Sequence, residues 1–585
     1  MNRSASSYLG ITPPVSTKLP ETFEFLATEK LIHSLNNYNQ YESIQEAENR
    51  QLVLGKLDLI FKEFVRNVSI KNGLPESLAN EVGGKIFTFG SYRLGVHGKG
   101  SDIDTLCVAP KHVRREDFLE HMYEALKSRP EVTEITAVAE AYVPIIKLEF
   151  SGIPIDLVFA KLAESSVPDD LDLSDDKLLR NLDERCVRSL NGSRVTDDIL
   201  RLVPKVESFR TALRCIKVWA KARAIYSNVM GFFGGVAWAI VVARVCQMYP
   251  NAAAATIVQK FFRIMCDWNW PQPVILKTIE EGPLAVRVWN PKIYPQDKSH
   301  RMPVITPAYP CMCSTHNVTA STQAVTTLEF SRAADIATKI MAGQENWNTL
   351  FQKNDFFHRY KYYLQVIAST NSAETQTKWA GLVESRLRQL VMKLELTDNL
   401  EIAHPFIKGY DKTVVCTTET QKNDAHHGIF QPNMNDTDPT PIDPNDTSTV
   451  LEEPVSIWTT TFYVGLGIKA KDSESTEGRK LDITWPTQEF TKLVKSWDQF
   501  DESTMGIVIK NIKSTSLPLD LYDESEKQKV IKKRTKTLKN RQSTNEIPPK
   551  KRRKPETIPT EPVPETAPSP PPTVSYAQVV QSQER

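Results

Sequence analysis

Apolar residues recur at intervals of three and four along much of the chain, and this spacing predicts amphipathic helices. It covers residues 23–70, 206–267 and 323–366. Between the first two stretches, residues 85–159 show short apolar runs that are typical of strands, interrupted by a helical pattern at 115–127. The order of patterns predicts an α+β chain rather than an all-helical one.

Four runs within residues 85–159 read as strands: "KIFTFGS", "SDIDTLCVA", "YVPIIKLEF" and "IPIDLVFA". The last two are joined by Ser151-Gly152, a dipeptide that favours a tight turn. They are therefore predicted to form a hairpin.

The pattern is mixed after residue 354. The runs "FFHRYKYYLQVIAS" and "FYVGLGIKA" read as strands, and "KWAGLVESRLRQLVMKLE" and "TQEFTKLVKSWDQF" read as helices. Elements of this size predict a small α+β sandwich. Residues 417–453 are rich in Asn, Asp, Thr and Pro, which predicts a long loop inserted in that sandwich.

The chain changes composition after about residue 523. Residues 527–554 are strongly basic and 555–572 are rich in proline. Such segments bury too little apolar surface to offset the entropy of ordering, so this tail is predicted to be disordered.

Charge and cysteine content narrow the class of protein. The net charge is +1, so any contact with nucleic acid must come from local basic patches rather than bulk charge. Eight cysteines are scattered without a CxxC pair or a histidine cluster at zinc spacing, which predicts buried thiols in a reducing compartment and no zinc site. The longest apolar run, residues 230–243, is too short to span a bilayer, and the N-terminus lacks a signal-peptide core. We therefore expect a soluble intracellular protein without a membrane segment.

The stretch "FGSYRLGVHGKGSDIDTLCV" carries the first chemical signal. Asp102 and Asp104 are two positions apart, so on a strand both side chains lie on one face. Carboxylates this close repel each other unless a cation lies between them, and a divalent ion is the simplest one. Gly90 allows the backbone to approach a ligand closely, and the Ser91 hydroxyl could bind terminal phosphates. Together these residues predict a nucleoside-triphosphate site.

A third carboxylate, Asp156, stands within the apolar run "IPIDLVFA". A lone carboxylate there is costly unless it is paired or binds a metal. Three carboxylates can hold two metal ions about 3.5–4 Å apart, the arrangement for in-line nucleotidyl transfer. The alternatives are a solvated strand edge for Asp102 and Asp104 and a buried structural carboxylate for Asp156.

A Gly-Ser turn, an Asp-x-Asp pair and a third Asp on a later strand resemble the nucleotidyltransferase superfamily signature. That signature alone would also fit a CCA-adding enzyme, an oligoadenylate synthetase or an aminoglycoside modifier. Longer blocks narrow the resemblance to the eukaryotic nuclear poly(A) polymerases, in their fungal form. These blocks are "FGSYRLGVHGKGSDIDTLCVAPKHV", "CVRSLNGSRVTDDILRLVP", "FRTALRCIKVWAKARAIYSNVMGFFGGVAWAIVVARVCQMYPNA" and "MPVITPAYPCM".

The resemblance implies an α+β multidomain protein. A mixed-sheet nucleotidyltransferase catalytic domain is expected at residues 19–205, and a helical central domain at 1–18 and 206–352. An RRM-like RNA-binding domain is expected at 353–525, followed by a disordered tail at 526–585.

The resemblance also implies a set of site residues. Asp102, Asp104 and Asp156 would be catalytic and would hold two Mg²⁺ ions, with Mn²⁺ as an alternative. Residues expected to contact the substrate ATP or the primer end are Phe89, Gly90, Ser91, Lys147, Lys217, Tyr226, Asn228, Gly235, Val236 and Met312. The alternatives without a role in binding are a solvated helix face for Lys217 and a helix-connecting turn for Tyr226 and Asn228.

The activity implied is template-independent transfer of AMP from ATP to the 3′-OH of RNA, with release of pyrophosphate. The alternatives are another RNA 3′ nucleotidyltransferase, uridylyl- or CCA-adding, or an inactive RNA-binding member. Expected partners are the single-stranded RNA 3′ end and subunits of a cleavage and polyadenylation complex, with a monomer outside that complex. Tyr360, Tyr362 and Tyr363 are candidates for base stacking, the alternative being that they are core aromatics.

The tail holds two basic clusters, "KKRTKTLKNR" at residues 532–541 and "PKKRRKP" at 549–555. Such clusters are typical of nuclear-import signals or of added RNA affinity, and the second, flanked by prolines, is the better import signal. A nuclear location is therefore expected. The alternative is a solvated basic tail.

Overall fold

The first part of the fold is a five-stranded mixed sheet. The computed structural model describes residues 8–139, 143–282, 284, 286–429, 450–469 and 481–532. The strands are β1 (Lys85–Phe89), β2 (Ile103–Ala109), β3 (Val132–Val138), β4 (Ile145–Phe150) and β5 (Ile153–Lys161). Their order is β1-β2-β5-β4-β3, with β2 and β5 parallel and the other neighbours antiparallel. The four predicted strands are confirmed, and Ser151 and Gly152 both have positive φ in the turn between β4 and β5.

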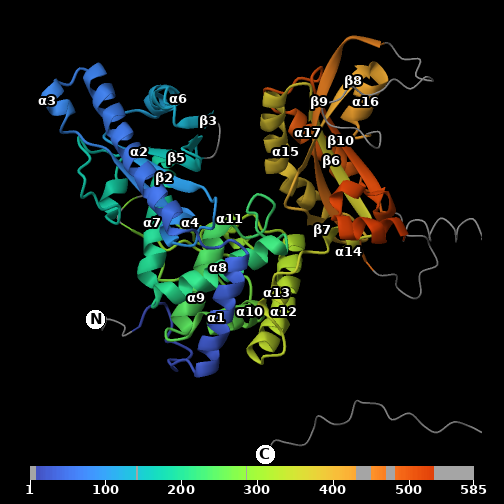
Figure 1. The fold of residues 1–585 in the computed structure, drawn as a ribbon, viewed down its shortest axis with the longest axis horizontal. Coiled ribbons are helices and arrows are strands. Elements are labelled where there is room, and N and C mark those ends of the chain that lie inside the picture. The colour runs from blue at the N-terminus through green and yellow to red at the C-terminus, as the bar shows by residue number, and fades with distance from the viewer. Residues whose placement is uncertain are drawn as a thin grey trace, which may run out of the picture. The chain divides into compact units, whose positions relative to one another are not determined.

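Helices cover both faces of this sheet, in the blue-to-teal part of the ribbon in Figure 1. Because strand side chains alternate, Ile103 and Cys107 pack with α2 on one face, and Leu106 and Val108 pack with α7 on the other. The helices here are α2 (Ile44–Lys71), α3 (Glu76–Ala79), α4 (Gly90–Leu94), the continuous run α5 (Arg115–Asp117), η1 (Phe118–Met122) and α6 (Tyr123–Lys127), then η2 (Asp176–Leu179) and α7 (Glu184–Leu202). The helix predicted at 115–127 is confirmed.

A group of helices follows the sheet. Its members are α1 (Thr22–Asn37), α8 (Val206–Ala222), α9 (Gly235–Met248), α10 (Ala254–Cys266), α11 (Pro295–Lys298), α12 (Ala320–Met341) and α13 (Trp347–Leu350). Trp219, Trp238, Phe261 and Phe330 meet at its centre with ring centroids 5.6–6.4 Å apart. Most of the apolar run at 230–243 is buried, but Gly235 and Val236 are exposed, and the helix begins only at Gly235.

Two helix predictions need correction. The pattern over residues 23–70 is two helices, because the chain leaves α1 at Tyr38 and restarts at Ser43, whose side chain accepts a hydrogen bond from the Glu46 N–H. The buried residues of α1 pack in the helical group, whereas those of α2 pack on the sheet. The helix predicted to reach residue 366 ends at Met341, and the strand that follows starts at Tyr362.

The last part of the fold is an antiparallel sheet with helices packed against it. Its elements are α14 (Phe356–Arg359), β6 (Tyr362–Thr370), α15 (Ala373–Leu394), β7 (Leu400–Pro405), β8 (Tyr410–Thr418), α16 (Glu419–His426), β9 (Val450–Ile468), α17 (Thr484–Lys495), β10 (Met505–Lys513) and η3 (Ser514–Ser516). The strand order is β10-β6-β9-β7, all antiparallel, and β8 pairs with the first half of β9. The α+β multidomain fold class is confirmed.

The prediction of a long loop at residues 417–453 is wrong at both ends of that range. Residues 419–426 form α16, which packs on β8 and β9, and β9 already begins at Val450. Thr418 caps α16 by accepting a hydrogen bond from the Gln421 N–H, so a helix begins where the loop was predicted. Residues 430–449 lie outside the described part of the chain.

Residues 518–532 form a separate unit with η4 (Leu519–Leu521) and a helical stretch at 524–532. Nearly all of the predicted tail, including the basic cluster at 549–555 and almost all of 532–541, lies outside the described residues. Among the residues that are described, no helix is long and apolar enough to cross a membrane.

Candidate active site

Four predicted site residues lie in one row across the first sheet. Strand pairing sets Phe89 opposite Asp104, Asp104 opposite Asp156, and Asp156 opposite Lys147. Directly paired residues on neighbouring strands point to the same face. The row therefore places residues from β1, β2, β5 and β4 side by side, although up to 67 positions separate them in the chain.

The three predicted carboxylates form one cluster. Oxygens of Asp102, Asp104 and Asp156 all lie within 4.8 Å of one another. Asp102 stands one position before β2 and is exposed, whereas Asp104 and Asp156 are half-buried. The expected alternation thus holds even though the first carboxylate precedes the strand.

The cluster is electrostatically strained without a cation. Burial, together with the charges of Asp102 and Asp156, raises the pKa of Asp104 to about 7. The Lys147 ammonium lies 2.8 Å from an oxygen of Asp156 and offsets part of the negative charge. A divalent ion among the carboxylates would relieve the remaining repulsion, and carboxylate oxygens are ligands that hard divalent cations prefer. The residues present fit a divalent metal site.

The Gly90-Ser91 turn lies against the triad. Gly90 has φ of +63°, and a Cβ atom there would stand 2.1 Å from Oδ2 of Asp104. A glycine is therefore required both for the left-handed backbone and for the close approach to the carboxylate. The turn begins α4 directly after β1.

Replacement of Gly90 by alanine is expected to reduce nucleotidyl transfer by about 100-fold or more, because the added methyl group displaces Asp104. Gly100→Ala is the matched control, since Gly100 has φ of +69° but a Cβ atom there would meet nothing within 4 Å. Both variants should lose a similar ~1–2 kcal/mol of stability to backbone strain. Turnover and thermal unfolding would be measured for both, and equal activities would contradict the steric argument.

A cavity of about 720 Å³ opens beside the triad. This volume suits a ligand the size of a nucleotide. Ten predicted residues line it: Phe89, Gly90, Ser91, Asp102, Asp104, Lys217, Tyr226, Gly235, Val236 and Met312. They come from the first sheet, from α8 and α9 and from the segment before α12, so the cavity lies between the sheet and the helical group.

Burial and nearby charges shift the pKa values of Lys217 and Tyr226 in the cavity. Burial and the nearby charges of Lys221 and Arg214 lower the pKa of Lys217 to about 8, while Asp102 and Asp104 oppose that shift. Burial raises the pKa of Tyr226 to about 12, and the same two carboxylates add to the rise. The Lys217 ammonium donates to the Val96 carbonyl at 2.8 Å.

Two predicted contacts do not line this cavity. Lys147 reaches the site only through Asp156, and the Asn228 side chain lies beside Gly234. Sequence reasoning also missed several lining residues: Arg188, Asn191, Lys221, Thr306 and His316. Helical spacing was the available signal, because Lys221 follows Lys217 by one turn and Asn191 follows Arg188 by three positions.

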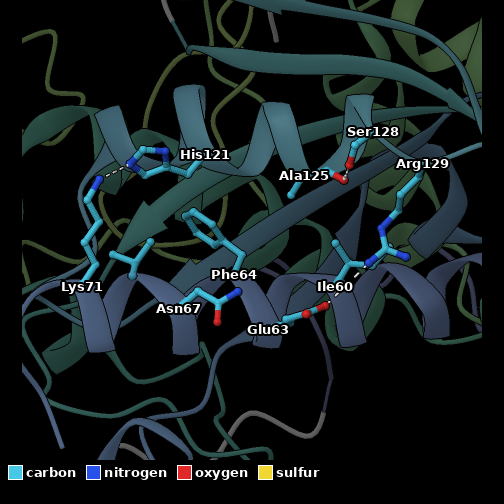
Figure 2. Close-up of a pocket in the computed structure, with 10 residues that line it drawn as sticks. Ile60, Glu63, Phe64, Asn67, Lys71, His121, Ala125, Ser128 and Arg129 are labelled. Atoms are coloured by element: carbon cyan, nitrogen blue, oxygen red, sulfur yellow. Dashed lines mark hydrogen bonds and ion pairs between the residues drawn. The ribbon is translucent and has the colours of Figure 1, made fainter. Parts of the chain in front are cut away.

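A second hollow, of about 380 Å³, lies between α2 and α6. In Figure 2 its polar groups face each other: Lys71 contacts His121 at 2.8 Å, and Arg129 contacts Glu63 at 3.6 Å. None of the triad carboxylates lines this hollow. The 720 Å³ cavity is therefore the candidate active site.

One of the three tyrosines proposed for stacking RNA bases is a core residue. Tyr363 is fully buried, and its hydroxyl donates to the Phe356 carbonyl. The Tyr360 hydroxyl lies 2.9 Å from Nδ1 of the buried His404. The alternative of a core aromatic is confirmed for Tyr363, whereas Tyr360 and Tyr362 are both half-buried and base stacking on them stays a prediction.

Comparison with known proteins agrees with this geometry. Three family models match consecutive parts of the chain: the poly(A) polymerase nucleotidyltransferase domain at residues 10–203, the poly(A) polymerase central domain at 208–353, and the poly(A) polymerase predicted RNA binding domain at 355–531. The poly(A) polymerase pla1 of Schizosaccharomyces pombe is 50% identical over 554 residues, covering 92% of this chain and 98% of that protein. The poly(A) polymerase PAPalpha of Candida albicans is 49% identical, covering 91% and 95%.

Among solved structures, the Cid1 poly(U) polymerase aligns with a TM-score of 0.37 at 14% identity, over 57% of this chain and 100% of that one. The three family models together, and each of the two curated relatives, cover far more than half of the chain. The chain therefore belongs to the poly(A) polymerase family, and it is a polynucleotide adenylyltransferase with the acidic triad Asp102, Asp104 and Asp156 that is typical of nucleotidyltransferases.

Proposed function

We propose that this chain adds AMP from ATP to the 3′-OH of single-stranded RNA in the 720 Å³ cavity, with two Mg²⁺ ions held by Asp102, Asp104 and Asp156. The observation that carries the proposal is the row of residues across β1, β2, β5 and β4. It sets Asp104 beside Asp156, and Asp102, two positions before Asp104, completes the cluster next to a nucleotide-sized cavity. Mn²⁺ accepts the same oxygen ligands and is the alternative ion.

The cavity offers complementary groups for the two ends of ATP. Lys217 and Lys221 lie one turn apart on α8, and with Ser91 they are the proposed contacts of the triphosphate. Val236 and Met312 are apolar, yet 39% and 41% exposed, and both line the cavity. Exposed apolar side chains in a cavity suit the flat faces of a base, so we assign the adenine to this end.

Further ATP contacts follow from the same cavity. Tyr226 lies against Gly235, where a Cβ atom would meet the tyrosine hydroxyl at 2.7 Å. We assign Tyr226 to the ribose or phosphates and Gly235 to the cleft floor. Asn228 stays our proposed adenine contact, and reaching the base from beside Gly234 would require its side chain to turn toward the cavity.

The reaction is a displacement at the α-phosphorus. The 3′-oxygen of RNA forms the new P–O bond, its proton leaves to solvent, and the bond to the β-phosphate breaks to release pyrophosphate. Divalent ions at the triad would supply the positive charge that favours 3′-OH deprotonation and stabilises the leaving group. The Lys217 ammonium adds positive charge beside the leaving phosphates, and Lys147, which donates to Asp156, is our proposed contact for the primer end or the nucleotide.

The test is extension of an unrelated 3′-OH RNA primer by the purified chain with each of the four nucleotides, Mg²⁺ and no template. Long tails from ATP alone, blocked by a 3′-deoxy primer, are the expected result. Tails from UTP or a short fixed addition would favour a uridylyl- or CCA-adding enzyme. RNA binding without extension would favour an inactive member.

We also infer a nuclear location and recruitment to a cleavage and polyadenylation complex, with a monomer outside it. Support comes from the basic cluster at residues 549–555, which carries five consecutive Lys and Arg residues at 550–554. Deletion of these five residues should move a fluorescent fusion of the chain toward the cytoplasm. Unchanged nuclear residence would overturn the import assignment.

A further inference from the structure

A ladder of hydrogen bonds joins α8 to the end of α4. Arg210, Arg214 and Lys217 are spaced four and three positions apart, so they lie on one face of α8. Their acceptors are three consecutive carbonyl oxygens, those of Leu94, Gly95 and Val96. These three hydrogen bonds, the rungs of the ladder, join the helical group to the sheet region.

The rungs are short and directional. Nε of Arg210 donates to the Leu94 carbonyl at 2.9 Å, and Nη2 of Arg214 donates to the Gly95 carbonyl at 2.6 Å. Lys217 completes the ladder at the Val96 carbonyl. Hydrogen bonds from charged donors are about twice as strong as neutral ones, so the three rungs form a strong seam.

Gly95 leaves room for the Arg210 guanidinium against the backbone. It caps α4 with φ of +71°, and a Cβ atom there would stand 2.6 Å from Nε of Arg210. The absence of a side chain at Gly95 therefore lets the guanidinium lie directly on the backbone.

Arg214 is held more tightly than a surface arginine. Its Nε donates to the Gln40 carbonyl at 3.2 Å, and its guanidinium lies 4.5 Å from the centre of the Tyr41 ring. Both residues belong to the link between α1 and α2. Arg214 thus joins three segments: α8, the end of α4 and the α1–α2 link.

The ladder forms part of the cavity wall. Leu94 and Val96 line the cavity from the sheet region, and Leu213 and Lys217 line it from α8. The Val96 N–H donates to the Ser91 carbonyl at 2.9 Å, so the seam is bonded back to the start of α4. The separation between the Gly90-Ser91 turn and Lys217 therefore depends on the rungs made by Arg210 and Arg214.

We propose that Arg210 and Arg214 are positioning residues for ATP, which hold Ser91 and Lys217 at the separation that a triphosphate bridges. The inference rests on the proposed function, because it takes the triphosphate to lie between these two groups. The arginines act through the carbonyls of Leu94 and Gly95 and make no contact with the substrate themselves. Loss of a rung widens the seam and weakens ATP binding, while the triad and the RNA-binding domain stay unchanged.

The experiment compares full-length Arg210→Gln and Arg214→Gln with the wild-type chain. Equilibrium binding of Mg-ATP without RNA would be measured by calorimetry, and KM for ATP, KM for RNA and kcat by primer extension. Both variants should raise the ATP dissociation constant and KM by about tenfold, with KM for RNA unchanged. Arg214→Gln should have the larger effect, because it removes bonds to two segments.

Conservative variants separate positioning from simple loss of stability. Arg210→Lys keeps a donor for the Leu94 carbonyl and should bind ATP like the wild type, whereas Arg214→Lys loses the planar fork that reaches the Gln40 and Gly95 carbonyls and should recover partly. These lysine variants also keep the test decisive if a glutamine variant unfolds. The matched control is Arg263→Gln on α10, where the arginine is exposed and bonds only to Asp267 among the described residues.

Each outcome decides between the roles. Lower melting temperatures with unchanged ATP affinity would overturn the positioning role and leave a structural seam. A rise in RNA KM equal to the rise in ATP KM would also overturn it. If the wild-type chain bound no ATP, the proposed function itself would be wrong. If the wild type bound ATP normally and the variants did too, only the positioning role of the two arginines would be wrong.

Discussion

Replacing Asp104 by asparagine is expected to abolish AMP transfer and yet leave the metal-free protein at least as stable as the wild type. Asparagine keeps the shape of the side chain and removes its negative charge. The triad then binds divalent ions poorly, and losing that charge stabilisation should lower turnover by at least about 1000-fold. A loss of this size cannot come from unfolding if the melting temperature holds.

The stability half of the prediction follows from the sign of the pKa shift. The pKa of Asp104 rises from 3.8 to about 7 through burial and the charges of Asp102 and Asp156. Protonated Asp104 therefore adds to the free energy of unfolding, fully so below pH 4, and this contribution is lost as pH rises through about 7. The loss amounts to about 4 kcal/mol of folding stability, and the Asp104→Asn variant does not undergo it because asparagine carries no charge.

The measurement is thermal unfolding with a chelator at pH 5 and pH 8, beside primer extension. The variant should melt at or above the wild type at pH 8, and added Mg²⁺ should stabilise the wild type more than the variant. Glu149→Gln is the matched control, because Glu149 lies on β4 two positions from Lys147 and bonds Thr133. A large fall in the melting temperature of Asp104→Asn at pH 8 would contradict the electrostatic account.

The triad was within reach of the sequence because its signals are local. The spacing of Asp102 and Asp104 and the apolar setting of Asp156 are visible in single strands. The strand register is not visible there, since it depends on which strands become neighbours. The sequence linked Lys147 to the site only by family resemblance. The structure shows why it lies there: Lys147 on β4 is directly paired with Asp156 on β5.

Other features depend on contacts between distant segments. The ladder between α8 and α4 joins residues 116 to 121 positions apart, and no periodicity within α8 identifies its acceptors. Strands β3, β7, β8 and β10 were not predicted, because their pairing with neighbours in the sheet, rather than a strong local pattern, makes them strands. The break between α1 and α2 did leave a local signal, the Ser43–Glu46 capping box, but residues 38–43 contain no glycine or proline to mark it.

Replacing Lys217 by methionine is expected to lower kcat/KM for ATP by about 100-fold and to remove an alkaline limb from its pH profile. Burial and neighbouring positive charges lower the pKa of Lys217 to about 8. In the wild type, the ammonium loses its proton as pH rises through that value, and its attraction for the triphosphate is lost with it. KM for ATP should therefore rise up to tenfold per pH unit above pH 8, while the phosphates, already fully ionised, keep a constant charge.

The variant separates this binding effect from stability. A lysine with a lowered pKa gives the folded state extra stability above its unfolded pKa of 10.5, and that stability is lost as pH falls through about 8. At pH 7 the buried ammonium therefore costs about 3 kcal/mol, and Lys217→Met should melt no lower than the wild type. Lys217→Arg, whose charge persists above pH 12, should bind ATP with a flat profile between pH 7.5 and 9.5. An alkaline limb that survived in Lys217→Met would assign the titration to another group and remove Lys217 from the triphosphate site.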